Sequence, residues 1–185
     1  MSTIQIRARE PTDIPALHAL IPLIHATTGY PVEGSAVPAS FLTPTSTLAA
    51  YVAVLTTPQT TTPLGQAALH PINPASTLFA ALQSHHPAAR AEDYVVLGRL
   101  FIAPFAQGQG VGRRLVCEAV ERARAWGRGV VLDVLEKDGA AVRFYERLGW
   151  RRLGVEGVYF PWAREGREGE VGFREFYYLA AERPG

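Results

Sequence analysis

A glycine-rich turn between a predicted strand and a predicted helix is the part of this sequence best suited to bind a ligand. It reads Gln107-Gly-Gln-Gly-Val-Gly112, and Arg113 and Arg114 follow it directly. Glycines tolerate positive φ and close approach, so successive backbone N–H groups can converge on an anion at the start of a helix. Two arginines in a first helical turn oppose the helix dipole unless an anion lies nearby. The pattern predicts a phosphate site that both arginines face, and a strand-to-helix turn without a ligand stays open as the alternative.

Two common nucleotide-binding motifs do not match this turn. A P-loop requires a Lys-Ser or Lys-Thr pair after its last glycine, and the sequence has none there. The dinucleotide fingerprint G-x-G-x-x-G could begin at Gly108 and Gly110, but Arg113 stands where its third glycine is required. Nucleoside triphosphate hydrolysis and Rossmann-type binding are therefore disfavoured.

Two polar side chains lie within apolar patterns downstream of the turn. Tyr145 shares one face of a predicted short helix with three apolar residues, Ala141, Phe144 and Leu148. This spacing favours a core ring whose hydroxyl reaches the rim, and an ordinary pKa of about 10 keeps that hydroxyl a neutral donor at pH 7. Asp133 interrupts the apolar run Val-Leu-Asp-Val-Leu. A carboxylate there is either a functional base or a salt-bridged strand residue, and both interpretations stay open.

The hydrophobic periodicity predicts a mixed set of strands and helices that must position these residues. Apolar runs predict strands over 4–7, 48–55, 64–70, 94–102, 130–135, 150–160 and 173–180. Helical spacing predicts a helix that begins at Thr12 or Asp13 and is closed by Pro22 and Gly29, and further helices over 78–83, 112–126 and 140–148.

The segments between these elements complete the predicted topology. The Thr/Pro run 56–63 predicts the turn of an antiparallel hairpin, and a Gly/Glu/Arg-rich turn is expected between the last two strands. Loops are predicted over 30–47 and 71–93, and the second is a long excursion that holds at most a short helix. The strand over 94–102 is too apolar for an edge and should be central.

Length and composition set the class of protein. The chain has 185 residues, a formal net charge of +1 and 48% hydrophobic residues, which suits a single domain over 1–185 with a real core. So small a net charge gives no global field for nucleic acid or an anionic membrane, and no stretch is apolar enough to span a bilayer. The single cysteine, Cys117, excludes an internal disulfide and a cysteine zinc cluster. Because the first residues do not form a secretory leader, we expect a cytoplasmic protein without a metal.

The spacing Gln107-x-x-Gly110-x-Gly112 resembles the Q/R-x-x-G-x-G/A signature of the GNAT superfamily of acyl-CoA-dependent N-acetyltransferases. The segment Asp138-Gly-Ala-Ala-Val-Arg-Phe-Tyr145-Glu-Arg-Leu-Gly-Trp is similar to the family's N-x-x-A-x-x-x-Y-x-x-x-G-F segment. The opening residues 6–13 also look like the family's first strand and helix start. The resemblance is dense over 94–153. It implies an acetyl-CoA-binding core there, with acceptor-side elements in 1–93 and 154–185.

The resemblance implies a GNAT-like α/β fold, with a mixed, mostly antiparallel central sheet splayed at its middle and helices on both faces. In that fold, backbone groups of Leu100, Phe101 and Ile102 would pair with the pantetheine arm of acetyl-CoA as an added strand. The pyrophosphate would be held by Gln107, Gly108, Gln109, Gly110, Val111 and Gly112, with Arg113 beside it. Asp138 stands where the family usually has Asn; it is also a favourable helix N-cap, and its carboxylate could accept a hydrogen bond from the pantetheine.

The resemblance also implies catalytic roles for Tyr145 and Asp133. Tyr145 would lie beside the coenzyme sulfur and protonate the departing thiolate. An amine with a pKa near 10.4 must lose a proton before it attacks, which calls for a base. Asp133 matches a position that carries a Glu base in some protein N-terminal acetyltransferases. Gly98-Arg99 stands where other relatives have a carboxylate that acts through water, so the identity of the base stays open.

We therefore predict an N-acetyltransferase in which the primary amine of a small molecule attacks acetyl-CoA directly. Residues 1–90 hold three basic and three acidic residues whereas 91–185 hold 15 and 14, so the charge-poor acceptor side favours a modestly polar amine over a polycation. The alternatives are a protein N-terminal or lysine acetyltransferase and a non-catalytic acyl-CoA-binding module. The resemblance is also compatible with a homodimer.

Two aromatic or imidazole groups are weaker candidates for acceptor contacts. His85-His86 lies in the long excursion, where solvated side chains are the simpler interpretation. Tyr159, Phe160 and Trp162 precede the last strand, where the family builds an acceptor wall, although core packing is the simpler interpretation.

Overall fold

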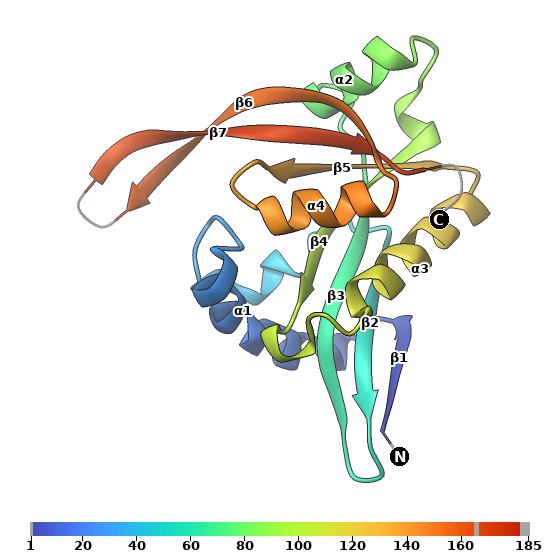
Figure 1. Cartoon of the computed structure of the whole chain (residues 1–185), viewed down its shortest axis with the longest axis vertical. Coiled ribbons are helices and arrows are strands. Elements are labelled where there is room, and N and C mark those ends of the chain that lie inside the picture. Colours follow the sequence, from blue (N-terminus) through green and yellow to red (C-terminus); the bar gives the residue numbers. More distant parts are fainter. Residues whose placement is uncertain (1, 165–166, 182–185) are drawn as a thin grey trace.

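In the described part of the chain, seven strands form one mixed sheet in the order β1-β2-β3-β4-β5-β7-β6 (Figure 1). The computed structural model describes residues 2–164 and 167–181, and for 155–164 and 167–173 it describes the backbone alone. The strands are β1 (Thr3–Ala8), β2 (Ala49–Thr56), β3 (Thr61–Pro71), β4 (Tyr94–Ile102), β5 (Gly129–Leu135), β6 (Arg151–Arg164) and β7 (Arg167–Leu179). β4 lies in the middle of this order, which confirms the prediction of a central strand.

The sheet opens between β4 and β5, the one parallel pair among the described strands. Residues 94–96 pair with 129–131, and the pairing goes no further although β4 continues to Ile102 and β5 to Leu135. Beyond this point β4 pairs only with β3 and β5 only with β7, and Figure 1 shows the two strands diverging. The predicted mostly antiparallel sheet, splayed at its middle, is confirmed.

Helices cover both faces of the sheet, as predicted. They are α1 (Ile14–Thr28), α2 (Thr77–His85), α3 (Val111–Ala125) and α4 (Gly139–Arg147). Successive residues of a strand point to opposite faces. Leu132 and Val134 of β5 therefore join the main core with residues of α3 and α4, whereas Val131 packs with Leu78 and Leu82 of α2. None of the described helices has the length and apolarity needed to cross a membrane.

The first helix is closed by Gly29, as predicted, but the expectation that Pro22 also closes it is wrong. α1 continues through Pro22 to Thr28, and Gly29 ends it in the left-handed region with φ of 71°. The buried face of the helix, which includes Leu17, continues to Ile24 beyond the proline. Packing of that face outweighs the hydrogen bond that a proline removes from a helix interior.

The last hairpin is also longer than predicted. The Gly/Glu/Arg-rich stretch expected as a turn belongs mostly to β6 and β7, whose ladder extends to the pair Arg164 and Arg167. Cross-strand pairing supplies backbone hydrogen bonds to residues of low strand propensity, a tertiary effect that local pattern does not reveal.

Candidate active site

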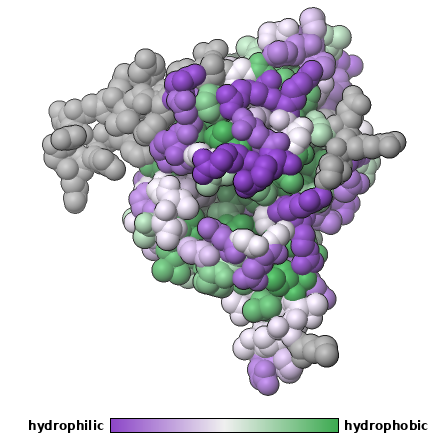
Figure 2. Space-filling view, viewed as in Figure 1, coloured by the Kyte–Doolittle hydropathy of each residue, from purple (hydrophilic) through white to green (hydrophobic). Residues whose placement is uncertain are grey.

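A cavity of about 540 Å³ lies between the end of β4, the turn before α3 and the start of α4; we call it the cradle cavity. Its wall includes many residues predicted to bind a coenzyme, namely Leu100, Phe101, Ile102, Gln107, Gly108, Val111, Gly112 and Asp138. Gln109, Gly110 and Arg113 are not part of this wall. Figure 2 shows a hollow on this side of the molecule, with a hydrophobic floor and a hydrophilic rim.

The turn before α3 presents an open backbone surface. Gly108 and Gly110 both have φ of 74°, and an added Cβ at either would meet no atom within 4 Å. α3 begins at Val111, so its first N–H groups, which have no partner within the helix, lie at this turn. The Gln107 amide instead donates to the carbonyl oxygen of Ile102 at 3.3 Å and ties the turn to β4. This arrangement suits a phosphate group held by backbone N–H groups.

The two arginines after the turn do not behave alike. Arg114 donates from Nη2 to the carbonyl oxygen of Ile4 at 2.9 Å, so the expectation that it faces a phosphate is wrong. The side chain points to β1 because α3 lies against that strand, which offers a carbonyl acceptor. Arg113 is exposed and lies outside the wall of the cradle cavity.

The edge of β4 toward the splay is open for strand addition over residues 97–102. This stretch pairs with β3 on one side and has no partner strand on the other. An amide-bearing arm can satisfy such a row of backbone groups as an added strand. On the paired side, β3 can come close to β4 only because residue 65 is a glycine. A Cβ at Gly65 would stand 2.2 Å from the carbonyl oxygen of Phe101.

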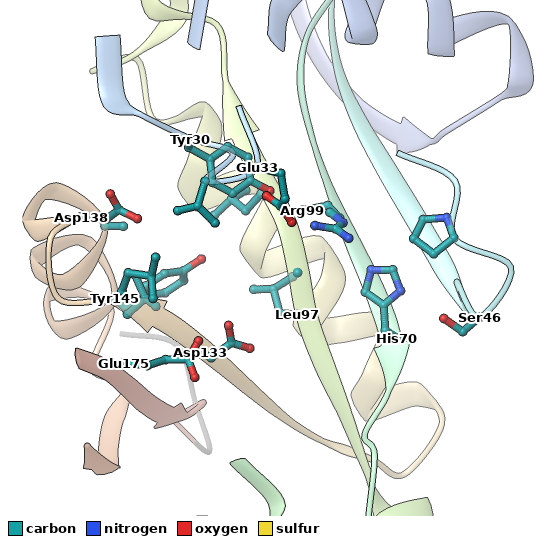
Figure 3. A pocket seen from close by; sticks show the side chains of 17 residues that line it. Tyr30, Glu33, Ser46, His70, Leu97, Arg99, Asp133, Asp138, Tyr145 and Glu175 are labelled. Carbon is teal, nitrogen blue, oxygen red and sulfur yellow. The ribbon is translucent and has the colours of Figure 1, made fainter. Parts of the chain in front are cut away.

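A second cavity, of about 490 Å³, opens where β4 and β5 part; we call it the splay cavity. Four residues line both cavities and mark the place where they meet: Tyr30, Leu100, Asp138 and Ala141. Figure 3 shows polar side chains from both sides of the splay pointing into the splay cavity. Tyr145 and Asp133, the two predicted catalytic residues, are both in its wall.

Tyr145 is buried on α4, as its helical spacing predicts, and lies in the wall of the splay cavity (Figure 3). Its ring packs edge-on against Phe144 and tilted against Trp150, with centroids 5.1 and 5.3 Å apart. Burial raises the pKa of its hydroxyl above the ordinary value, and the charge of Asp133 acts in the same direction. The hydroxyl therefore stays protonated at neutral pH and can donate.

Asp133 forms a pair with a carboxylate that the sequence did not mark, Glu175 of β7. Asp133 lies opposite Tyr177 in the β5–β7 ladder and Glu175 is two residues from Tyr177, so both carboxylates share one face of the sheet. Figure 3 shows the two side chains side by side in the wall of the splay cavity.

The protonation of this pair follows from its surroundings. Asp133 is accessible from the cavity, but the surrounding protein limits its hydration and raises its pKa, an effect that a hydrogen bond with Glu175 and the charge of Arg99 partly offset. Burial, together with the negative charge of Asp133, raises the pKa of Glu175 to about 7. The pair therefore shares one proton near neutral pH, and one carboxylate stays charged.

Arg99 lies in the wall of the splay cavity at a bulge in β4. The register shifts between the pair Gln66 and Phe101 and the pair Ala68 and Gly98. Arg99 has φ of 54°, the single positive φ found at a non-glycine residue in the described ranges. Its guanidinium lies 3.8 Å from the centroid of the Phe41 ring. The sequence showed that a carboxylate is missing here, and the structure shows that a cation takes its place.

His70 and Tyr30 also line the splay cavity, and no motif marks either residue. The Nε2 of His70 is buried without a hydrogen-bond partner among the residues described. Burial, with the charges of Arg99 and Arg9, lowers the pKa of His70, so its imidazole is neutral at pH 7. Burial raises the pKa of the Tyr30 hydroxyl to about 12.

Asp138 stands at the N-cap position of α4, but its side chain does not cap the helix. Its carboxylate accepts from Nζ of Lys137 at 2.7 Å, and its carbonyl oxygen accepts from the N–H groups of Ala141 and Val142. The predicted N-cap position of Asp138 is confirmed, although its carboxylate bonds the neighbouring ammonium instead of a backbone N–H of the helix. The side chain still reaches the junction of the two cavities.

The histidine pair lies away from both cavities. His85 contacts the carbonyl oxygen of Leu153 at 2.5 Å through Nε2, and Arg151 contacts Nε2 of His86 at 2.5 Å. The pair thus joins α2 to β6 and is more than solvated surface.

The remaining sequence candidates do not add to the site. Cys117 is half-buried on α3. Tyr159, Phe160 and Trp162 lie outside the residues whose side chains are described. The described residues include no group of His, Cys, Asp and Glu suited to hold a metal ion.

The chain belongs to the GNAT family of acetyltransferases, because the model of the acetyltransferase (GNAT) family matches residues 25–150. Enzymes of this family use acetyl-CoA, and the open edge of β4 and the glycine turn fit its pantetheine arm and phosphates. The protein is therefore an acetyl-CoA-dependent acetyltransferase. In a comparison of sequence alone, no curated protein matches the chain.

Solved structures share the fold over nearly the whole chain. NAA60 from Arabidopsis thaliana in complex with acetyl-CoA has a TM-score of 0.68 at 17% identity, covering 96% of this chain and 97% of that one. An N-acetyltransferase from Staphylococcus aureus Mu50 has a TM-score of 0.66 at 16% identity, with 96% and 97% covered. The ribosomal-protein-S18-alanine N-acetyltransferase from Escherichia coli has a TM-score of 0.60 at 19% identity, with 98% and 96% covered. At these identities the likeness shows the fold, which confirms the GNAT-like architecture expected from the motifs.

Proposed function

We propose that the protein transfers the acetyl group of acetyl-CoA to the primary amine of a small molecule, by direct attack of the amine on the thioester. The observation that carries this proposal is the meeting of two cavities at Leu100 and Ala141, one beside the coenzyme turn and one lined by ionisable side chains. The splay cavity, at about 490 Å³, has the volume of a small-molecule site.

In this proposal, Tyr145 is the general acid. Its hydroxyl lies on the splay-cavity side of the junction between the two cavities, and burial keeps it protonated at neutral pH because it raises the pKa. The thiol of the coenzyme has a pKa near 8.5, so its thiolate needs only a hydrogen bond or a proton as it leaves, and a neutral tyrosine provides either. A phenylalanine at this position would keep the ring packing on Phe144 and Trp150 and lose the donor.

Asp133 is the proposed base, with Glu175 as its proton-sharing partner. A primary ammonium loses two protons on the way to the amide. One proton replaces the acetyl group on the coenzyme sulfur, and the other must leave through a base. The singly charged pair attracts the ammonium and can accept that proton, because Asp133 is ionised while Glu175 holds the shared proton.

The test is the release of coenzyme thiol from acetyl-CoA with a panel of primary amines that includes short peptides. A small amine should release thiol with a kcat/KM above that of any peptide. Asp133→Asn should lower kcat by about 10²-fold or more, because the variant lacks the charged acceptor. A peptide with a higher kcat/KM than every small amine would instead support a protein N-terminal or lysine acetyltransferase.

A further inference from the structure

The splay cavity contains one arginine that is placed to receive an anion. Arg99 is half-buried in the wall, and its guanidinium lies over the Phe41 ring. Among the described side chains, no carboxylate forms an ion pair with it. A guanidinium offers a planar fork of N–H donors that matches a carboxylate in a bidentate geometry. One face of the guanidinium lies on Phe41 and one donor reaches the Tyr30 hydroxyl, so the remaining N–H groups of the fork are the ones that a ligand would contact.

The backbone holds Arg99 in a costly conformation. Its φ of 54° is unfavourable for a residue with a Cβ, and such strain persists only where the surroundings enforce it. The buried amide of Gln66 donates to the carbonyl oxygen of Arg99 at 3.4 Å, and Arg9 donates to the other end of that amide at 2.8 Å. A cation held in this way loses little freedom when a ligand binds.

The opposite wall of the cavity carries the complementary charge. Asp133 and Glu175 come from the other side of the splay, together with Tyr145 of α4 (Figure 3). The amine that attacks the thioester must lie on this side, near the junction with the cradle cavity. Arg99 comes from β4 and its side chain lies across the cavity from the pair (Figure 3). A ligand that carries both charges would match both walls.

We infer that the acceptor bears a carboxylate in addition to its primary amine, as a free amino acid does, and that Arg99 binds this carboxylate. The inference rests on the proposed function and specifies the class of its substrate. His70, beside Arg99 in the wall, adds a neutral imidazole at the same end of the cavity. The cavity volume of about 490 Å³ accommodates a molecule of this size.

Glu33 is the acidic group that competes with such a ligand. It is exposed, belongs to the loop after α1 and lies near Arg99 in Figure 3, but forms no ion pair with it among the described contacts. A bound carboxylate would feel its repulsion. Glu33→Gln should therefore raise kcat/KM for a carboxylate-bearing acceptor by about two- to fivefold at low salt.

The test compares matched acceptors in the thiol-release assay. Each L-amino acid of a panel is compared with the amine that lacks its carboxylate and with its carboxamide. The concentrations are chosen so that the unprotonated form of each acceptor is present in equal amount. The wild type should favour the amino acid by at least about tenfold in kcat/KM. Arg99→Gln should lower kcat/KM for the amino acid about 10- to 100-fold more than for the decarboxylated amine, because loss of the charge that also acts on Asp133 affects both acceptors while loss of the fork affects the amino acid alone. Arg99→Lys keeps the charge and loses the fork, so its kcat/KM for the amino acid should lie between the values for the wild type and for Arg99→Gln.

A binding measurement separates this inference from the proposed function. A carboxylic acid that lacks the amine should raise the melting temperature of the wild type but not of Arg99→Gln, whether or not turnover occurs. If no amine releases thiol while this acid still binds through Arg99, the proposed function fails and the anion site stands. The inference is overturned if the wild type uses each amino acid no better than its decarboxylated amine and its carboxamide, or if Arg99→Gln lowers kcat/KM for all three equally. It is also overturned if the acid without an amine stabilises the wild type and Arg99→Gln to the same extent.

Discussion

The fully buried amide of Gln66 donates a hydrogen bond of 3.4 Å to the carbonyl oxygen of Arg99, the residue at which β4 bulges. The other end of the amide accepts from Nη1 of Arg9 at 2.8 Å, and the same atom of Arg9 also donates to the carbonyl oxygen of Leu42. One side chain in β3 thus connects the end of β1 to the place where the central strand changes register. The position of Arg99 in the splay cavity depends on this connection.

Gln66→Met should destabilise the protein by about 2 kcal/mol, because it keeps the volume but leaves the half-buried guanidinium of Arg9 with an unmet donor. The midpoint of thermal unfolding should fall by about 4–8 °C. Gln83→Met is the matched control, since Gln83 is exposed on α2, and its effect should stay within about 0.5 kcal/mol. Equal effects of the two substitutions would contradict the role of the network.

Gly65→Ala should destabilise the protein by about 2–3 kcal/mol, because the new Cβ would stand 2.2 Å from the carbonyl oxygen of Phe101 and neither backbone can yield cheaply. Any folded fraction should show a higher KM for acetyl-CoA, since β4 must shift where the pantetheine arm would pair. Gly154→Ala is the control: its nearest neighbour, the Cβ of Ala81, is 3.8 Å away. Urea unfolding of both variants measures the difference.

Tyr145→Phe should lower kcat by about 10²-fold while the KM for acetyl-CoA changes less than about threefold, because the donor is lost and the ring packing remains. Steady-state kinetics with a saturating amine measures this split. Tyr51→Phe is the control, since the Tyr51 hydroxyl accepts from Arg122 and lines neither cavity. Parallel losses in kcat and in coenzyme affinity would make Tyr145 a structural residue only.

Glu175→Gln should remove part of the pH dependence of stability. Because folding raises the pKa of Glu175 to about 7, the folded state binds this proton more tightly than the unfolded state does. The stability that this proton contributes is complete below the ordinary carboxyl pKa and is lost as the pH rises to about 7. The wild type should lose about 1 kcal/mol between pH 5 and 8, allowing for screening of a partly exposed group, and the variant less. Glu136→Gln, an exposed partner of Arg174, should retain the wild-type slope.

The same substitution should move the acidic limb of the rate profile. In the wild type, kcat/KM should fall below about pH 7 as Glu175 takes up the proton that the pair shares and the pair keeps one negative charge instead of two. The glutamine amide cannot take a proton and can donate to Asp133, so the pKa of Asp133 should fall and the limb should move to lower pH. A limb that stays in place in Glu175→Gln would show that Glu175 does not share a proton with the base.

Much of the fold was predictable because its signals are local. The continuous apolar run of Tyr94–Ile102 marks a buried strand, and the structure has β4 over the same residues. The alternate glycines before Val111 mark the turn that opens α3, and the spacing around Tyr145 marks the buried face of α4. The motifs that resemble the family's coenzyme-binding segments also lie within this one stretch, residues 94–153.

The contacts of Arg114 and the lining of the splay cavity were less predictable, because the residues involved come from segments far apart in the sequence. Arg114 could be placed on α3, but the carbonyl oxygen of Ile4 that it contacts belongs to the first strand. His70 and Tyr30 occupy no motif, and they line the site only because β3 and the loop after α1 border the splay.

The sequence by itself determined the family motif, the central strand and the two residues Tyr145 and Asp133 as candidates, since these depend on neighbours within one turn or one strand. Only the tertiary structure decided that Glu175 shares a proton with Asp133, because β7 inserts between β5 and β6 in the sheet. It also decided that Arg99 points into the splay cavity, because a bulge against β3 and the ring of Phe41 orient that side chain. Strand order and register bring distant charges together, and neither is encoded in local periodicity.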